Sequence, residues 1–159
     1  MSLDPKANTA GVLMPPPILF GLAVAIGFVL TRFIPLFWPT IILPYAEPVG
    51  WGLAVLGLAT IAWSAITFTN QGTPVQPHHA TTALVINGPY QYSRNPIYLS
   101  LILMTFGMAF IANMPWIAIF LVPTVLVLNE GIIKREEAYL ERLFGDDYLA
   151  YKKSVRRYF

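Results

Sequence analysis

Long apolar runs separated by short polar connectors dominate the pattern of this chain. The runs predict four membrane helices, at residues 16–37, 48–69, 96–112 and 115–133. Each run is near the length of about 20 residues that a helix needs to cross the hydrocarbon core of a bilayer. The third and fourth runs begin with a proline, which a helix tolerates in its first turn. We therefore expect a single domain of the all-α class, an integral membrane bundle of four transmembrane helices.

From Lys134 onward the pattern becomes charged and amphipathic. Residues 134–159 hold seven of the ten basic residues and five of the eight acidic residues. Leu140, Leu143 and Phe144 form an apolar stripe on a helix that we expect to stop at Gly145. A second short helix is predicted over residues 146–153, with two aspartates at its start. We expect this amphipathic tail to lie in the cytosol and not to form a fifth span.

Composition and charge placement support a membrane protein with a defined orientation. The chain is 56% hydrophobic and 11% charged, whereas soluble domains have about 25% charged residues. The connectors at 38–47 and 113–114 carry no Lys or Arg, while Lys6, Arg94 and the basic tail fall on the opposite side. By the positive-inside rule both termini are cytoplasmic, and we place the protein in the inner membrane of a bacterium. The absence of cysteine excludes disulfides, thiolate catalysis and Cys-ligated metals.

Arg94 stands out because it is the only formally charged residue between Pro48 and Asn129. A charge at a bilayer centre costs about 2.5–3.5 kcal/mol on insertion scales, so it needs a partner or a function. The predicted topology places Arg94 at the same face as Glu136 and Glu137. Arg94 can hold a carboxylate in a bidentate fork, and the glutamates can accept hydrogen bonds from hydroxyl or amino groups. Two alternatives stay open: Arg94 as an interfacial anchor, and the glutamates as a solvated helix face.

The long polar connector at residues 70–95 is the other candidate for function, because loops of this length are usually functional or disordered. Tyr90, Tyr92 and Tyr98 offer aromatic faces to a ligand ring or cation, or belong to an interfacial belt. Adjacent histidines, His78 and His79, give only a weak metal signal, and we expect no metal site. Together these residue types suit several zwitterionic ligands.

Two separated motifs resemble the superfamily of isoprenylcysteine carboxyl methyltransferases and phospholipid methyltransferases. The first motif reads GPYQYSRNPIYLS over residues 88–100, and the second is Glu136-Glu137, one predicted span later. The family pattern is GPY, three residues, R-H-P-x-Y-x-G, a membrane span and then a glutamate pair. The C-terminal segment is also similar to that of the family, so the resemblance covers about residues 72–159.

The resemblance implies methyl transfer from S-adenosyl-L-methionine, bound at the cytosolic face, to a hydrophobic or amphiphilic small-molecule acceptor that enters from the bilayer. Nucleic acid is not an expected partner. Methyl transfer from a sulfonium is an in-line displacement, and the protein would act by positioning the reactants and excluding water from them. Arg94 and Glu137 are the predicted catalytic residues. The cofactor-binding residues implied position by position are Tyr90, Arg94, Asn95, Pro96, Tyr98, Glu136 and Glu137.

Three positions depart from the family pattern. Asn95 stands where histidine is frequent, and asparagine cannot titrate near neutral pH. Ser100 replaces the usual glycine. Ser154 stands where the prenylcysteine enzymes have an arginine thought to serve the substrate carboxylate, although Arg156 and Arg157 are nearby. These departures bear on the acceptor more than on the cofactor.

Two other functions compete with methyl transfer. The membrane sterol reductases resemble the C-terminal half of the same family and use NADPH. A 2′-phosphate would need a further basic cluster, which residues 70–95 do not provide. The remaining alternative is a non-catalytic membrane accessory protein, in which Arg94 and the glutamate pair only lock the tail onto the bundle.

Overall fold

The computed structural model describes residues 14–40, 42–70 and 84–158. Every regular element in these ranges is helical, and none of them contains a strand. Lys6, and His78 and His79 in the long connector, lie outside the described residues.

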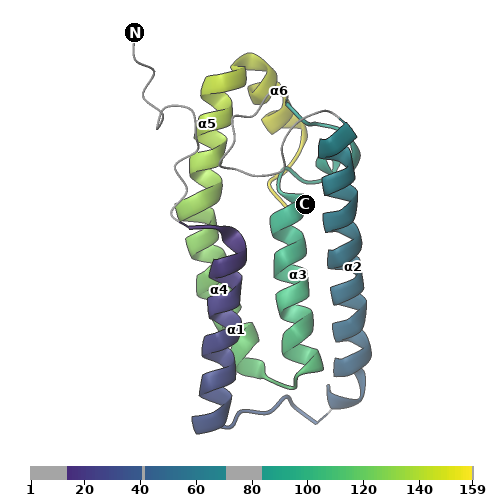
Figure 1. Ribbon diagram of the computed structural model, residues 1–159, viewed down its shortest axis with the longest axis vertical. Helices are drawn as coiled ribbons and strands as arrows, with labels where there is room; N and C mark the ends of the chain where they lie inside the picture. Colours follow the sequence, from purple (N-terminus) through teal and green to yellow (C-terminus); the bar gives the residue numbers. More distant parts are fainter. Residues whose placement is uncertain (1–13, 41, 71–83, 159) are drawn as a thin grey trace.

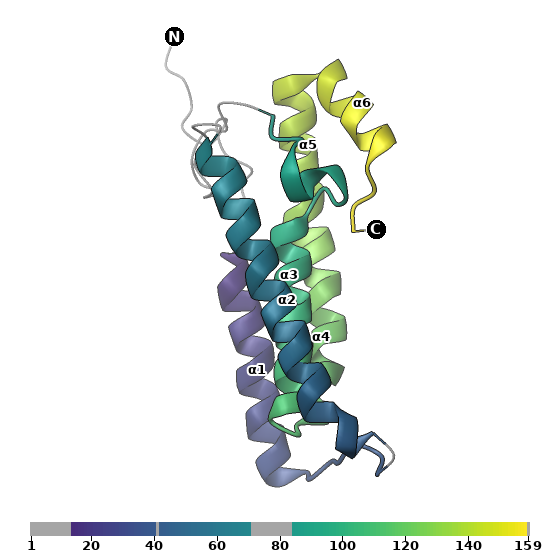
Figure 2. The same ribbon diagram turned by 90° about the vertical axis from the view of Figure 1, so that its right-hand side faces the viewer.

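Four long helices form a bundle, and short helices cover one end of it (Figure 1). The long helices are α1 (Pro16–Phe33), α2 (Leu43–Asn70), α3 (Pro96–Ile111) and α4 (Pro115–Leu128). A 3-10 turn, η2 (Gly88–Gln91), precedes α3. A π-helical turn, η3 (Asn129–Ile133), joins α4 to α5 (Lys134–Phe144), and α6 (Asp146–Ser154) follows. In Figures 1 and 2 α5 continues the line of α4, and α6 turns back over the end where α3 begins.

Helix α3 lies between α2 and α4, while α1 packs mainly on α4. Glycines allow α2 and α3 to approach closely. A Cβ atom built on Gly107 would lie 2.6 Å from the backbone oxygen of Gly50, and one on Gly57 would lie 2.9 Å from the backbone oxygen of Ser100. Gly50 and Gly57 therefore form a small surface on α2, and this is the face that contacts α3.

Apolar side chains fill the inside of the bundle and also cover its outside. A buried cluster joins α1 to α4 and η3 through Leu19, Phe20, Leu121, Leu128, Ile132 and Ile133. Large apolar side chains on the outer faces of α1, α2 and α4 are exposed, including Leu22, Val29, Leu56, Leu58, Val122 and Leu126. Exposed apolar surface of this extent suits a lipid environment, so the predicted integral membrane character agrees with the structure.

Within the described residues, three helical stretches are long and apolar enough to cross a membrane. They are Pro16–Phe33, Leu43–Asn70 and the continuous helix Pro115–Phe144. Helix α3 has 16 residues, just below the lower limit of about 17 for a span. The all-helical membrane class is confirmed, while the crossing by α3 and the cytosolic place of the tail stay predictions.

Two predicted helix boundaries are wrong for local reasons. The first helix ends at Phe33 instead of residue 37. Its last backbone hydrogen bond runs from the N–H of Ile34 to the oxygen of Leu30 at 2.7 Å. Pro35 follows two residues beyond the end of the helix and has no N–H with which to continue it. The second helix begins at Leu43, five residues before Pro48. Pro48 removes one hydrogen bond to the carbonyl of Pro44, and both prolines are exposed, so that carbonyl is not trapped in the core.

The other boundaries lie close to the prediction. Helix α3 ends at Ile111 and α6 spans 146–154. Gly145 ends α5 with a φ of 53°, a backbone conformation that favours glycine. Lys134 does not begin a separate helix: its N–H bonds to the carbonyl of Asn129, five residues earlier, and the helix continues from α4 through η3 into α5. The change at Lys134 is one of polarity only.

Candidate functional site

The tight turn before α3 positions Arg94. Gly88 opens it with a φ of +60°, and a Cβ there would lie 2.6 Å from Oγ1 of Thr67 on α2. Glycine therefore meets both a backbone requirement and a close contact. The N–H of Asn95 donates to Oγ of Ser93 at 3.2 Å, and the buried Pro96 then starts α3. The motif is thus a compact turn that ends in a helix.

The glutamate pair reaches this turn from the first turn of α5. Adjacent residues point about 100° apart around a helix, so the two side chains meet different partners. The Tyr98 hydroxyl donates to Oε1 of Glu136 at 2.6 Å. Nη2 of Arg94 lies 3.3 Å from Oε1 of Glu137. The structure therefore brings together Arg94, Tyr98, Glu136 and Glu137, as the sequence predicts.

The C-terminal segment crosses the same turn, close to the start of α3 (Figure 2). The backbone N–H of Arg94 donates to the carbonyl of Arg156 at 3.0 Å. The carbonyl of Arg157 accepts from Oγ of Ser93 at 3.0 Å and from Nδ2 of Asn95 at 3.3 Å. Asn95, predicted as a cofactor contact, thus hydrogen-bonds the end of the chain.

Arg157 completes an ion-pair cluster that the sequence did not reveal. Its Nε and Nη2 donate to Oε1 and Oε2 of Glu137 at 3.0 and 2.8 Å, a bidentate fork. This hydrogen bonding raises the pKa of Arg157. Glu137 is only 6% exposed and lies between two guanidinium groups. The only sequence signal for Arg157 was its nearness to the departure at Ser154.

The Arg94 side chain is buried but only partly paired. It is 10% exposed. Its Nε and Nη1 are buried and have no hydrogen-bond partner within the part of the chain that the structure describes. Buried donors of this kind are rare because an unmade hydrogen bond costs the desolvation of the group. The guanidinium can therefore accept an anionic group in addition to Glu137.

Tyrosines from η2 and α6 wall the cluster. The Tyr151 hydroxyl donates to the carbonyl of Tyr90 at 2.7 Å, and both residues are buried. Tyr148 is 2% exposed, and burial raises its pKa to about 12, with Glu137 acting in the same direction and Arg94 against it. These phenols are therefore neutral at physiological pH. Tyr92 is 70% exposed and lies outside the wall.

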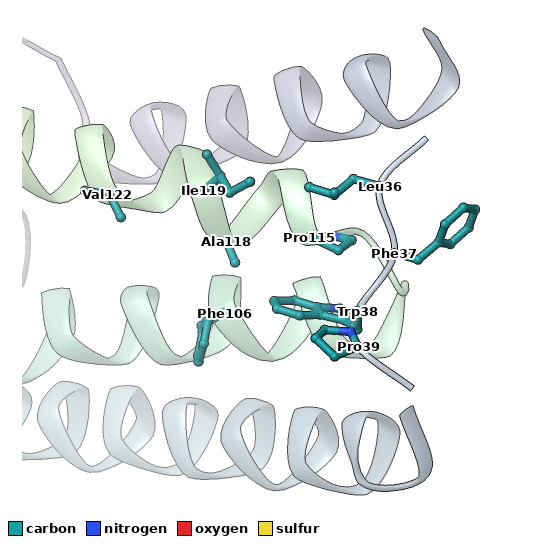
Figure 3. Close-up of a pocket in the computed structure, with 9 residues that line it drawn as sticks. All are labelled: Leu36, Phe37, Trp38, Pro39, Phe106, Pro115, Ala118, Ile119 and Val122. Carbon is teal, nitrogen blue, oxygen red and sulfur yellow. The ribbon is translucent and has the colours of Figure 1, made fainter. Parts of the chain in front are cut away.

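Two further features of the described residues bear on function. The described residues contain no group of three or more His, Cys, Asp or Glu side chains that could hold a metal ion. A pocket of about 440 Å³ lies at the opposite end of α3 and α4, between these helices and the α1–α2 connector (Figure 3). Its lining is apolar: Leu36, Phe37, Trp38, Pro39, Phe106, Pro115, Ala118, Ile119 and Val122.

Comparison with known proteins points to the same part of the chain. Residues 46–147 match the phospholipid methyltransferase family, a range that includes η2, α3, α4 and α5. A stretch of 64 residues is 41% identical to an uncharacterized protein of Haemophilus influenzae, covering 39% of this chain and 98% of that protein. No solved structure matches the chain. Because the family match extends over more than half of the chain, this protein belongs to the phospholipid methyltransferase family.

Proposed function

We propose that the protein transfers a methyl group from S-adenosylmethionine to a lipid-like or small hydrophobic acceptor at the cytosolic face of the membrane. The observation that carries this proposal is the guanidinium of Arg94, whose buried Nε and Nη1 have no hydrogen-bond partner among the described residues. Membership of the phospholipid methyltransferase family supports methyl transfer, for which S-adenosylmethionine is the usual donor.

The residues around Arg94 have the chemistry that this cofactor requires. Arg94 would hold the carboxylate of the methionine part, because charge-assisted bonds from a guanidinium are the strong ones. Glu136, oriented by Tyr98, would face the amino, sulfonium or ribose groups. Tyr90 and Pro96 shape the wall and the turn beside them. The cluster thus combines a cationic and an anionic pole, which matches a zwitterion.

The protein's own contribution is orientation and exclusion of water. When bound, the cofactor supplies an electrophilic methyl group. Glu137 keeps Arg94 in place from within the protein, and the neutral tyrosines keep the surroundings of low polarity. Well-oriented reactants in a dry site lower a barrier by several kcal/mol. A carboxylate or thiolate acceptor would need no general base, whereas an ammonium acceptor would first lose a proton.

The competing functions are less well supported. The family match favours methyl transfer over an NADPH-dependent reduction. An accessory protein would need only a closed ion pair between bundle and tail, yet Arg94 keeps two buried donors beyond that pair. Entry of an amphiphilic acceptor from the bilayer agrees with the apolar outer faces of the helices.

Binding of labelled S-adenosylmethionine to the protein in lipid nanodiscs tests the proposal. We expect wild type to bind, and Arg94→Ala to bind about 10–100-fold more weakly, since a hydrogen bond to a charged group is worth about 1.5–3 kcal/mol. Arg94→Lys should also lose affinity because lysine lacks the fork. Arg142→Ala is the matched control, because Arg142 is an exposed arginine of α5. Absence of wild-type binding, or full binding by both Arg94 variants, would refute the proposal.

A further inference from the structure

The last described residues, 155–158, form a strap that is attached at several points. Backbone carbonyls of Arg156 and Arg157 accept three hydrogen bonds from the turn before α3. At its end the Tyr158 hydroxyl donates to Oδ1 of Asn129 in η3 at 2.9 Å. A π turn is often found at a functional site. The strap therefore connects the turn that carries Arg94 to the helix that carries the glutamate pair.

The guanidinium of Arg157 takes up both oxygens of Glu137. The contact of Arg94 with the same carboxylate is longer and involves one nitrogen, 3.3 Å from Nη2 to Oε1. A carboxylate that is free to turn would instead form a bidentate fork with the nearest guanidinium. Arg157 thus stops Glu137 from engaging more of the Arg94 donors.

The charges and the exposure of the two arginines also favour Arg157 as the main partner of Glu137. Two guanidinium groups, those of Arg94 and Arg157, share the one carboxylate of Glu137, while the carboxylate of Glu136 bonds to Tyr98. Arg157 is 31% exposed on its side chain, whereas Arg94 is 10% exposed. The better solvated cation therefore makes the stronger contact with Glu137, and the more deeply buried Arg94 makes the weaker one.

We propose that Arg157 is a positioning residue for cofactor binding: by holding Glu137 with both oxygens, it keeps the buried edge of Arg94 open for the carboxylate of S-adenosylmethionine. This inference rests on the proposed function and adds to it a residue outside the two recognised motifs. It also gives the C-terminal strap a function, because the backbone bonds to Ser93 and Asn95 fix the place of Arg157.

The test compares two probes, S-adenosylmethionine and its decarboxylated analogue, on the full chain in nanodiscs. We expect Arg157→Ala to weaken binding of the first about tenfold and to leave binding of the second unchanged. Arg157→Lys should recover part of the affinity because lysine can neutralise Glu137 without the fork. Arg156→Ala is the matched control, since only the backbone of that exposed residue contacts the turn.

A double variant separates positioning from general destabilisation. If Arg157 acts through Glu137, then Arg157→Ala with Glu137→Ala should bind no more weakly than Glu137→Ala alone. Three results would overturn the role of Arg157 while leaving methyl transfer intact. The first is an equal loss of affinity for both probes, and the second is an additive loss in the double variant. The third is wild-type affinity in both Arg157→Ala and Arg157→Lys. Failure of wild type to bind either probe would overturn the proposed function and this inference with it. Should Arg157→Ala not fold, Arg157→Lys carries the same comparison.

Discussion

At the scale of single residues, the central feature is a carboxylate shared by two arginines in an apolar surrounding. A buried ion pair contributes little net stability, because desolvation offsets the attraction of the charges. Removing one partner is costly, since the remaining charge is left uncompensated. Glu137 therefore has to be present for Arg94 and Arg157 to lie together in this part of the protein.

Glu137→Gln should destabilise the protein by about 3–5 kcal/mol, because two cations would remain close together without their counter-charge. The matched control is Glu130→Gln. Glu130 also pairs with a cation, Lys134 at 2.6 Å, but both side chains are more than half exposed. Exposed helical pairs contribute about 0.3–0.5 kcal/mol, so this change should be almost neutral. Chemical unfolding in detergent measures both variants, and similar values for the two would contradict the buried role of Glu137.

Part of this cluster could be predicted from residue types and topology. Arg94 is conspicuous as a lone charge in an apolar stretch, and the alternation of spans places Glu136 and Glu137 at its end of the bundle. Arg157 could not be selected in the same way. It is one of several basic residues in the tail, and only the return of the strap over the turn distinguishes it.

At the scale of elements, the close contact between α2 and α3 depends on glycines, which have no side chain to keep the helices apart. The Cβ positions of Gly50 and Gly107 face backbone atoms of the opposite helix at 2.7 and 2.6 Å, and backbone cannot give way as a flexible side chain can. Close packing of this kind supports helix association in a bilayer, where apolar burial alone gives little drive.

Gly107→Ala should therefore separate α2 from α3 and destabilise the protein by about 1–3 kcal/mol, as overpacking does in well-packed cores. Gly52→Ala is the matched control on α2, because a Cβ there meets nothing within 4 Å. That change should be neutral or slightly stabilising, since alanine is the better helix former. Thermal unfolding of both variants in the same detergent gives the comparison. A destabilised Gly52→Ala with an unchanged Gly107→Ala would refute the contact.

The helix boundaries show which helix ends can be predicted from the local preferences of proline and glycine and which cannot. Proline marks the true start of α3 and α4, and Gly145 the true end of α5, because these residues act on their own backbone. Pro48 has the same local preference but lies inside α2, since the carbonyl that it frees is not buried. The π turn η3 has no such signature in its residues, so the unbroken helix from α4 to α5 was not predictable.

At the scale of the whole molecule, the length of α3 decides how often the chain crosses the membrane. Helix α3 has 16 residues and so measures about 24 Å at 1.5 Å per residue, less than the hydrocarbon thickness of about 30 Å. Its neighbours α2 and α4 are antiparallel to it and lead to the same ends of the bundle (Figure 1). A short span is accommodated by local thinning of the bilayer at modest cost. We therefore expect α3 to cross, which puts Arg94 and the glutamate pair at one face.

The chain itself allows a direct test, because it contains no cysteine and each introduced one is unique. Thr40 lies before α2 and Ala112 directly after α3, whereas Asp147 belongs to α6, which Figure 1 shows at the other end of the bundle; all three residues are exposed. If both termini are cytoplasmic, a membrane-impermeant maleimide should label Thr40→Cys and Ala112→Cys in intact bacterial spheroplasts, and Asp147→Cys only after permeabilisation. Reversed labelling would place the Arg94 site outside the cytosol. Labelling at Thr40→Cys with none at Ala112→Cys would show that α3 stops within the bilayer.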